Sequence, residues 1–590
     1  MTLSLPSRIV HYAWATTAGI TAVANLQTIP DNATLQAMPT TAASTVLRYD
    51  YVVGGGAPAV LYNASGSACT LNGGAGDNGS QVRSADGKCW IANLNGIEPN
   101  PKIWGCLGDG VADDAACLQA AIAATGPGKL YSGRHLYRTN TGLSSSSPGF
   151  EFVCESKRSG SDPNPYGLRA GAANLTLLSL NGSDQAVRNC YIDMTNNGTL
   201  ANTSGTAIAI GITSNAVVEE NYIYGPCNGI DVNGNVPHAY RNRITSQNVD
   251  NSGCSGIRIG NLTAGANTVD AHLEYNVVEG GYPKPFDAAV LILDSGGPTL
   301  GYNDFLFSLW GVKIVPGAKQ VVTWLTATGT YLGDTTVLGS LYIDATASSA
   351  LVTGLTFNQT WTASATNGPG VTIKNTGGGI VKGIHFNQHR SYNNALSGFD
   401  VQAGSEISID ASMVCNNNTA RPRSASGIKL AAGVSKVQIR NNRIASDCSG
   451  STIAGAQGFG IDLIDGSNSE IMITGNNLYD PRAYAPIGGT PRGMSIVANN
   501  LGVDDTTGST LASAATININ AVYPRWHITG TKGINTIDGF WGGRVVNFMT
   551  DNGSVAFSTG GNICNAYKSA GAGASVYADY DLSAACWRLH

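Results

Sequence analysis

The sequence predicts an all-β protein built as a right-handed parallel β-helix, a solenoid in which each turn of the chain stacks on the one before it. Three features predict this fold: a strand-and-bend phrase recurs between about residues 175 and 480, 75 of the 590 residues are glycine, and only 12% are charged. Short strands separated by glycine and asparagine suit turns stacked about 4.8 Å apart. The low charge fits too, because like charges stacked at that spacing repel each other.

The first half of the phrase is a short strand that follows a glycine. Its residues alternate between apolar and polar, which predicts strands with one face toward a core. These strands begin at Gly229, Gly256, Gly311, Gly370, Gly398, Gly427 and Gly460.

The second half is a bend with the pattern apolar-x-x-Asn-x-apolar. An inward asparagine at a sharp bend tolerates left-handed backbone, and its amide can bond to the asparagines of the turns above and below. The sequence predicts such a ladder at Asn221, Asn242, Asn276, Asn303, Asn358, Asn387, Ser412 in place of an asparagine, Asn442 and Asn476.

An open coil exposes strand edges, and residues 113–125 predict a helix that caps the N-terminal end. Asp113 and Asp114 supply hydrogen-bond acceptors at the helix start. Leu118, Ala121 and Ile122 form an apolar stripe, and the segment ends in Gly126-Pro127. We interpret the two aspartates as structural rather than catalytic.

Three regions follow from these patterns. Residues 1–100, rich in Gly, Ala and Ser, form an N-terminal head; 101–500 form the β-helix; and 505–590 form a small C-terminal β region. We interpret the last region as a trimer clamp, a sugar-binding module or an end cap without a ligand. Residues 12–24 are mildly apolar and end in Ala-Val-Ala, which is similar to a secretory cleavage site.

Composition excludes several classes of function. A net charge of −5 argues against a basic nucleic-acid-binding face. The sequence contains no run of 18 apolar residues, so we predict no membrane span. The 12 cysteines are scattered without a CxxC pair, so we predict no metal or cofactor and interpret most cysteines as buried free thiols. Only Cys69–Cys89 and Cys564–Cys586 have spacings that favour local bridges.

Residues 104–114, Trp-Gly-Cys-Leu-Gly-Asp-Gly-Val-Ala-Asp-Asp, resemble the opening signature of pectate-lyase-superfamily β-helices. The signature is frequent in bacteriophage tailspikes and capsule-degrading depolymerases; this chain departs from it at Trp104 and Cys106. The resemblance extends over about 104–480. It implies a homotrimer in a virion tail that acts on bacterial surface polysaccharide, with tail or baseplate proteins as partners of the N-terminal region. The alternative is a secreted bacterial protein. Because the superfamily includes lyases, hydrolases, epimerases and binders, the resemblance specifies the fold rather than the reaction.

Outward side chains of stacked turns form columns that can be read from the sequence. The residues two before each ladder position are Glu219, Tyr240, Glu274, Gly301, Thr356, His385, Asp410, Arg440 and Thr474. The outward residues of the glycine-led strands are Asp231, Arg258, Leu291, Lys313, Tyr342, Thr372, Asp400, Lys429 and Asp462.

Glu219 and Glu274 share the first column, two turns apart, with Tyr240 between them. At about 4.8 Å per turn their backbones lie about 9.6 Å apart. This is the upper edge of the separation of about 6.5–9.5 Å in inverting glycosidases and far from the roughly 5 Å of retaining ones. The pair therefore predicts general-acid and general-base hydrolysis, with Asp231 as the next catalytic candidate. Tyr240, Arg258, His272, Trp310 and Lys313 are the predicted substrate-binding residues.

Alternatives remain open at this point. A uronate lyase would use Tyr240, Arg258 and Lys313 to neutralise a carboxylate and take its α-proton. An adhesive spike would bind in the same groove without cutting. In a trimer, Asp400 or Asp410 of another column could complete a site between subunits. His385 and His389, about 13 Å apart along a strand, do not form a metal pair, and we expect a surface role for both.

Overall fold

The structure, a computed structural model, describes residues 26–155, 165–246, 253–260, 268–281, 285–448, 456–464, 467–480, 482–503, 510–519 and 523–590. The segment 12–24 lies outside the described residues. Internal contacts divide the chain into two compact units. The first holds the chain up to Gly108 together with residues 116–125 and 129–131, and the second holds residues 109–115, 126–128 and 132–590.

The first unit contains a five-stranded sheet around buried Val46, Tyr62 and Trp90. Arg48 is buried beside them, and its guanidinium donates to Asn32 Oδ1 (2.6 Å) and to the Ile103 carbonyl (2.9 Å). The sheet order is β1 (Gln27–Ile29), β2 (Thr45–Arg48), β3 (Val60–Ser65), β5 (Cys89–Asn93), β4 (Gln81–Arg83); helices are α1 (Asn32–Ala37) and the 3-10 turns Asn72–Gly74 and Pro101–Trp104.

The helix expected near 113–125 is α2 (Ala115–Thr125), followed by β7 (Gly128–Tyr131). Its predicted apolar stripe, Leu118, Ala121 and Ile122, is buried. The carboxylate that accepts at the helix start is that of Asp113, 3.2 Å from the Ala115 N–H. Gly126 has a φ of 55°, a value that favours glycine at a helix end.

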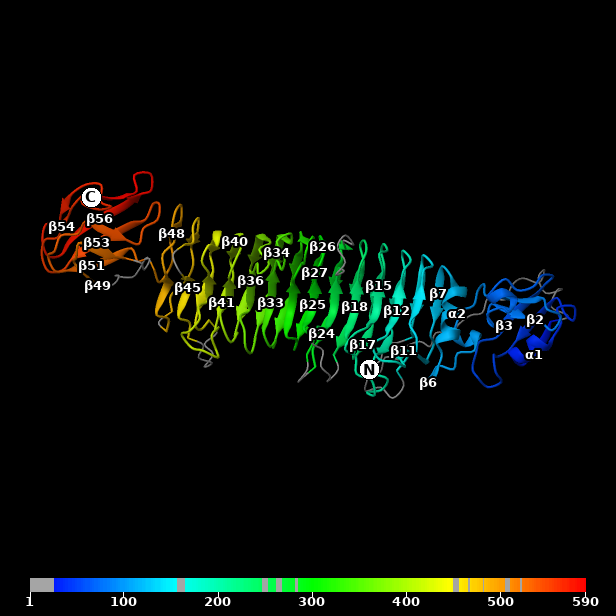
Figure 1. Cartoon of the computed structure of the whole chain (residues 1–590). Coiled ribbons are helices and arrows are strands. Elements are labelled where there is room, and N and C mark those ends of the chain that lie inside the picture. The colour runs from blue at the N-terminus through cyan, green and yellow to red at the C-terminus, as the bar shows by residue number, and fades with distance from the viewer. Residues whose placement is uncertain are drawn as a thin grey trace, which may run out of the picture. The chain divides into compact units, whose positions relative to one another are not determined.

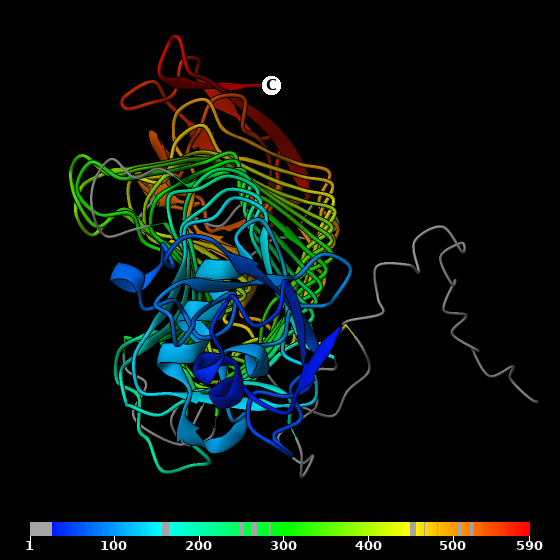
Figure 2. The ribbon, with the colours of Figure 1, turned by 90° about the vertical axis from the view of Figure 1, so that its right-hand side faces the viewer.

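The predicted parallel β-helix forms the body of the second unit, and its rungs contribute strands to three parallel sheets (Figure 1). Seen along the coil in Figure 2, successive rungs overlie one another. Aliphatic and aromatic side chains from all three sheets, such as Val218, Ile223 and Ile230, fill the interior.

Each sheet takes its strands from successive rungs. Sheet 1 holds β10 (Phe150–Val153), β13 (Ala186–Arg188), β16 (Val217–Glu219), β19 (His238–Tyr240), β22 (Thr268–Val269), β23 (His272–Glu274), β26 (Ser295–Gly296), β27 (Thr299–Gly301), β30 (Val321–Thr323), β31 (Thr326–Thr328), β34 (Leu351–Asn358), β37 (Ile380–Asn387), β40 (Ser405–Asp410), β43 (Ser435–Arg440), β46 (Met472–Thr474) and β48 (Ile496–Ala498). Sheet 2 holds β6 (Asp109–Asp113), β8 (Leu136–Thr139), β11 (Gly167–Ala170), β14 (Tyr191–Asp193), β17 (Tyr222–Tyr224), β20 (Arg243–Thr245), β24 (Val277–Glu279), β28 (Asp304–Leu306), β32 (Tyr331–Asp334), β35 (Trp361–Ala363), β38 (Arg390–Tyr392), β41 (Met413–Cys415) and β44 (Arg443–Ala445). Sheet 3 holds β9 (Leu143–Ser145), β12 (Thr176–Leu180), β15 (Thr206–Ile210), β18 (Asn228–Val232), β21 (Ser255–Ile259), β25 (Ala288–Ile292), β29 (Trp310–Ile314), β33 (Gly339–Asp344), β36 (Val371–Lys374), β39 (Phe399–Val401), β42 (Ile428–Leu430), β45 (Phe459–Leu463) and β47 (Ala485–Gly488).

The asparagine ladder runs along the bend between sheets 1 and 2. The backbone N–H and the side-chain amide of Asn221 both donate to Asn242 Oδ1, at 3.1 and 3.0 Å. Asn242 donates in the same way to Asn276, and Asn276 to Asn303. The ladder keeps each bend in register with the next and so fixes which side chains face outward.

The ladder then departs from the prediction at Asn358 and Asn387. Both lie on the outer face of sheet 1, where Asn387 pairs in register with Asp410. The buried ladder positions of these rungs are Thr360 and His389, since the hydroxyl and the imidazole satisfy the bend in place of an amide. The outward column therefore contains Asn358 and Asn387 rather than Thr356 and His385.

His389 is fully buried, so the expected surface role for it is wrong. Its Nδ1 lies 2.8 Å from Thr360 Oγ1 and its Nε2 lies 3.0 Å from Thr362 Oγ1. Burial lowers the pKa of His389 to about 3. The imidazole is therefore neutral at physiological pH and serves as a structural hydrogen-bonding group.

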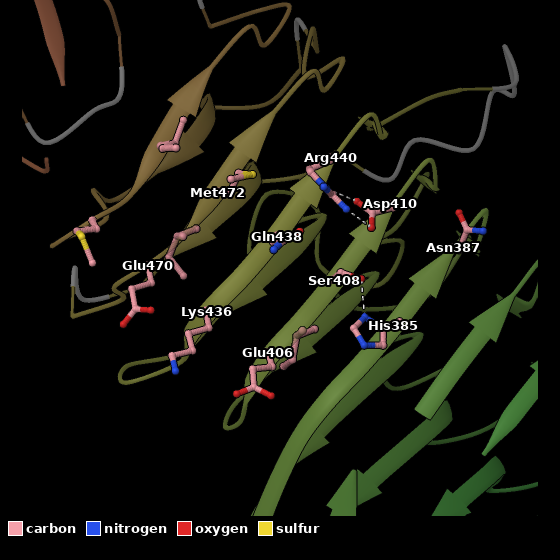
Figure 3. Close-up of a pocket in the computed structure, with 14 residues that line it drawn as sticks. His385, Asn387, Glu406, Ser408, Asp410, Lys436, Gln438, Arg440, Glu470 and Met472 are labelled. Atoms are coloured by element: carbon pink, nitrogen blue, oxygen red, sulfur yellow. Dashed lines mark hydrogen bonds and ion pairs between the residues drawn. The ribbon is translucent and has the colours of Figure 1, made fainter. Parts of the chain in front are cut away.

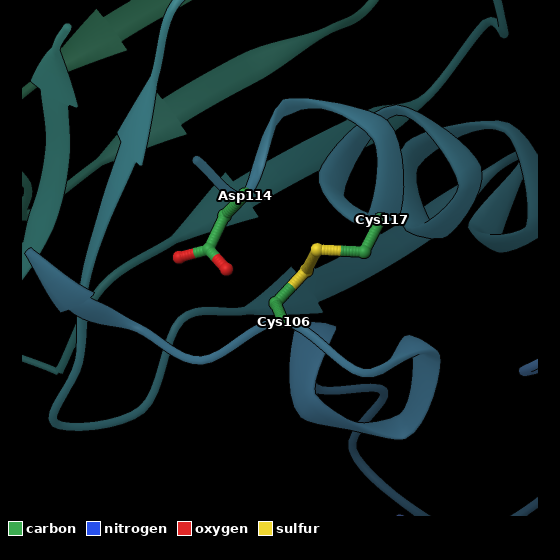
Figure 4. Close-up of side chains that lie close together, drawn as sticks. All are labelled: Cys106, Asp114 and Cys117. Atoms are coloured by element: carbon green, nitrogen blue, oxygen red, sulfur yellow. A yellow bond between two sulfur atoms is a disulfide. The ribbon is translucent and has the colours of Figure 1, made fainter. Parts of the chain in front are cut away.

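All 12 cysteines are paired, so the prediction of buried free thiols is wrong and the two predicted local bridges are confirmed. Figure 4 shows the bridge between Cys106 and Cys117. The other pairs are Cys154–Cys190, Cys227–Cys254 and Cys415–Cys448. These three pairs are separated by 36, 27 and 33 residues, about the length of one rung, so neighbouring rungs bring the thiols together.

The C-terminal region has a core of its own that includes Trp526, Phe548 and Trp587. Its main sheet mixes parallel and antiparallel pairs in the order β49 (Thr510–Ala512), β51 (Arg525–Thr529), β53 (Val545–Thr550), β56 (Ala574–Asp581), β57 (Cys586–Leu589). Two small pairs are β50 (Thr516–Asn518) with β52 (Thr536–Asp538) and β54 (Ala556–Phe557) with β55 (Tyr567–Lys568).

Candidate functional site

The outer face of sheet 1 carries the predicted column of Glu219, Tyr240 and Glu274. Val218 and Leu273 point into the core, so the residues on either side of them face outward. The strands place Glu219 opposite Tyr240 and Tyr240 opposite Glu274. The two carboxylates therefore lie on alternate rungs of one column, with a phenol between them.

These side chains line one hollow of about 290 Å³, which we name the glutamate hollow. His238 and His272 lie on the same strands one outward position earlier, and their rings stack 4.7 Å apart. Of the predicted binding residues, Tyr240 and His272 thus join the glutamates. The residues that line the hollow are Arg188, Val217, Glu219, His238, Ala239, Tyr240, His272 and Glu274.

The two glutamates have different electrostatic surroundings. Glu219 forms an ion pair with Arg188, which favours the ionised carboxylate. Glu274 makes no ion pair with any other side chain in the described part of the chain. Burial, followed by the neighbouring His272, lowers the pKa of His238, and Glu274 opposes this effect. One carboxylate is therefore paired with a guanidinium, whereas the other shares the hollow with the Tyr240 phenol and the two histidine rings.

An aromatic edge leads away from the glutamate hollow along the bend. The Arg241 guanidinium lies over the Tyr240 ring (4.7 Å) and near the Tyr275 ring (5.8 Å). Tyr275 in turn stacks on Tyr302 with ring centres 5.3 Å apart. Side chains at successive bends thus continue the surface of the hollow onto the next rungs.

The second predicted column lies on sheet 3 and is in register along its whole length. It runs through Asp231, Arg258, Leu291, Lys313, Tyr342, Thr372, Asp400, Lys429 and Asp462. Because this column belongs to another sheet, its members do not line the glutamate hollow.

Asp231 is buried and bonded to Arg258 Nη2 (2.5 Å) and Thr206 Oγ1 (2.8 Å). Burial raises the pKa of Asp231, and Arg258 opposes that change. The structure separates Asp231 from the two glutamates and gives it a structural ion pair.

The other sheet 3 candidates also have partners on or directly beside that sheet. Lys313 Nζ lies 2.8 Å from Asp287 Oδ2, and the Trp310 ring packs 4.6 Å from that of Tyr342. The lyase set of Tyr240, Arg258 and Lys313 is therefore not brought together.

A second and larger hollow, of about 620 Å³, lies farther along the outer face of sheet 1 (Figure 3). We name it the charged hollow. Asp410 and Arg440 form a two-point ion pair at 2.8 and 2.9 Å, and His385 Nδ1 lies 3.0 Å from Ser408 Oγ. The lining residues are His385, Asn387, Glu406, Ile407, Ser408, Asp410, Lys436, Gln438, Arg440, Glu470, Ile471, Met472, Met494 and Ile496.

Sequence reasoning placed Asp410 and Arg440 in a column but missed this hollow. Its remaining charges come from Glu406, Lys436 and Glu470, which occupy left-handed backbone positions with φ of 57°, 55° and 56°. Each lies four residues before the outward column position, and that spacing is the signal that could have found them. Glu406 and Glu470 also lie two rungs apart, with Lys436 on the rung between them.

Within the described residues, no helix combines the length and apolar character that crossing a membrane requires. The class of molecule that the fold and the site define is a parallel β-helix with an acidic, aromatic-edged hollow on one outer sheet face.

No protein-family model matches the sequence, and no curated protein matches it by sequence. Solved structures are similar to it in fold. The enzymatically active domain of tailspike protein 2 from bacteriophage CBA120 is 11% identical, with a TM-score of 0.41 over 80% of this chain and 62% of that one. The chain spans 55% of the full-length tailspike protein 2.

Two enzymes from bacteria are also similar. A mannuronan C-5 epimerase A-module from Azotobacter vinelandii is 15% identical, with a TM-score of 0.37 over 68% of this chain and all of that one. The catalytic unit of an α-1,3-glucanase from Streptomyces thermodiastaticus is 14% identical, with a TM-score of 0.36 over 67% of this chain and 74% of that one. These similarities concern the fold.

Proposed function

We propose that this protein is an extracellular depolymerase that binds a bacterial surface polysaccharide and hydrolyses it in the glutamate hollow. The observation that carries the proposal is the pairing of Glu219 and Glu274 on alternate rungs of one hollow, one ion-paired and the other without an ion pair to a described side chain. Hydrolysis of a glycosidic bond needs one carboxyl group that donates a proton and one that accepts a proton from water.

The surroundings of the two groups assign the roles. Glu274, which makes no ion pair with a described side chain, is the general acid, and Glu219, paired with Arg188, is the general base. In the reaction the Glu274 carboxyl protonates the glycosidic oxygen as its bond to the anomeric carbon breaks. Water attacks that carbon from the opposite face and gives its proton to Glu219. We expect the product anomer to be inverted, since backbones about 9.6 Å apart leave room for a water molecule between the two carboxyl groups.

Neighbouring side chains would position the sugar. Tyr240 presents a ring and a hydroxyl between the two carboxylates, and Arg241 against the ring limits its motion. The stacked pair of His238 and His272 forms the opposite side of the hollow and offers ring nitrogens to sugar hydroxyls.

A uronate lyase is the second candidate. The contact between Arg241 and Tyr240 favours these two residues as its catalytic groups over the set of Tyr240, Arg258 and Lys313 that the sequence suggested. Arg241 would neutralise the uronate carboxylate and Tyr240 would take the α-proton. In this structure, however, Arg241 also lies 3.7 Å from Glu220 Oε1, which competes for its charge. A purely adhesive protein is the third candidate and would leave the polymer intact.

The six disulfides support an extracellular site of action, because such bridges persist in oxidising compartments. They favour the secreted alternative over a spike that assembles in a reducing cytosol. A homotrimer and attachment to tail or baseplate proteins stay predictions from the family resemblance.

The test is digestion of a panel of purified capsular and extracellular bacterial polysaccharides. Hydrolysis releases reducing ends without ultraviolet absorbance, whereas β-elimination creates an unsaturated sugar that absorbs. If no polymer in the panel loses viscosity or chain length, adhesion is left as the function.

A further inference from the structure

Three rungs of uncharged side chains join the glutamate hollow to the charged hollow. In one outward column, His272 is followed in register by Thr299, Thr326, Thr356 and His385. In the other, Glu274 is followed by Gly301, Thr328, Asn358 and Asn387. Both columns thus begin in one hollow and end in the other, about 19 Å away at four rungs of about 4.8 Å.

These connecting rungs form a polar strip without charge. Thr299, Thr326, Thr328, Thr356 and Asn358 are all half-buried, so their hydroxyl and amide groups stay accessible. Such groups donate and accept hydrogen bonds without demanding a charged partner. The strip therefore suits a ligand that is rich in hydroxyls and uncharged where it crosses.

An exposed aromatic ring borders the strip on each side. Tyr302, which directly follows the strand β27, is 57% exposed, and Trp324, two residues before β31, is 71% exposed. Each ring lies against a glycine of the next rung: a Cβ at Gly329 would come within 2.6 Å of Tyr302, and one at Gly354 within 2.8 Å of Trp324. Both glycines have positive φ, so a side chain there would also be strained.

Neither ring contributes to folding stability as a buried ring would. Both residues adopt left-handed backbone, with φ of 52° and 58°, as do residues at the same bends of other rungs, such as Tyr275 and Glu406. Large aromatic side chains contribute most to stability when buried, yet Trp324 is mostly in solvent. The exposure of two large rings beside the strip points to a ligand that covers them.

We propose that the strip is a binding track for a polysaccharide chain, which stacks sugar rings on Trp324 and Tyr302 and reaches from the glutamate hollow to the charged hollow. This inference rests on the proposed function, because the same polymer would be cut at one end of its bound stretch. It assigns the substrate class as a long polymer with uncharged sugar units over the track, rather than a short oligosaccharide.

The experiment measures binding by the full-length protein with Glu219→Gln and Glu274→Gln, so that the probe is not degraded. Native gels contain one polysaccharide each: dextran as a neutral polymer, alginate as a fully anionic one, and purified bacterial capsular polysaccharides. The expected result is retention by a polymer with neutral units and little retention by alginate. Retention by no polymer, or strongest retention by alginate, overturns the proposal.

On this background, Trp324→Ala is expected to weaken affinity for the retained polymer by about three- to tenfold, as loss of an aromatic contact would. Thr326→Glu, which adds a charge to the track, is a second variant with the same expected direction. Tyr577→Ala removes a similarly exposed ring from β56 of the C-terminal sheet and serves as the matched control, with no expected change. Unchanged affinity in both track variants overturns the proposal.

Reducing-end release by the wild-type protein is measured in parallel and separates the two proposals. If Trp324→Ala weakens binding but the wild-type protein releases no reducing ends, the track stands and hydrolysis fails. If reducing ends appear and Trp324→Ala changes neither binding nor KM for the polymer, hydrolysis stands and the track fails.

Discussion

Glu219 and Glu274 occupy alternate rungs of one outward column, with Tyr240 in register between them. This relationship is a product of the fold, because the asparagine ladder at the adjacent bend holds the three rungs in register. The proposed chemistry depends on the two carboxylates acting as a pair.

Substitution of either glutamate by glutamine is expected to lower kcat by about 10²- to 10⁴-fold, because each variant removes one proton-transfer group. Both side chains are partly exposed, so unfolding midpoints should stay close to the wild-type value. Glu155→Gln, an exposed glutamate paired with Arg134, is the matched control and should keep full activity. Activity within a fewfold of wild type in Glu274→Gln would contradict the assignment.

Asn242→Ala is expected to lower the free energy of unfolding by about 2–4 kcal/mol. The buried amide accepts from the Asn221 N–H groups and donates to Val218 and Asn276, and each lost bond contributes about 1 kcal/mol. Asn387→Ala, at an outward position that the sequence pattern assigned to the ladder, should change the unfolding free energy by less than about 0.5 kcal/mol. Equal effects of the two substitutions in chemical denaturation would contradict the ladder as described.

Because His389 is buried, we expect the free energy of unfolding to fall in acid. Its pKa is about 3 in the folded chain against an ordinary 6.5, so the unfolded chain binds the proton first. This contribution to stability is present above about pH 6.5 and falls by up to about 1.4 kcal/mol per pH unit down to about pH 3. His389→Asn should flatten the slope of unfolding free energy against pH over that window. An unchanged slope would show that His389 is not the group responsible.

The rung-spanning disulfides are expected to be formed in protein made in an oxidising compartment. Maleimide labelling of the denatured chain should find no free thiol, and Cys154→Ser with Cys190→Ser should lower stability by about 2–4 kcal/mol. Protein made in a reducing cytosol should label at several cysteines and unfold at a lower temperature. Free thiols in the mature, oxidised protein would contradict the pairing.

Much of the fold could be predicted from the sequence because its signals are local and repeated. Glycine-led strands and the bends at Asn221, Asn242, Asn276 and Asn303 specify the coil and align its columns. The prediction was wrong where another residue type makes the hydrogen bonds that an asparagine makes elsewhere in the ladder. Thr360 and His389 complete the buried hydrogen bonds of the ladder, so the nearby Asn358 and Asn387 were misassigned.

Sequence reasoning also found the glutamate column but grouped with it residues of another face. Sheet 3 carries four of these residues, Asp231, Arg258, Trp310 and Lys313. The order of residues within one rung does not show which outward columns share a hollow. The disulfides were missed because a separation of about one rung becomes meaningful only once the turns are known to stack.

The most direct test of the central claim is ¹H NMR of the first product released from a cleaved polymer, recorded before the anomers equilibrate. Paired action of Glu219 and Glu274 across a water molecule predicts a product whose anomeric configuration is opposite to that of the cleaved linkage. A product that keeps the configuration, or one that carries a carbon–carbon double bond, would contradict it.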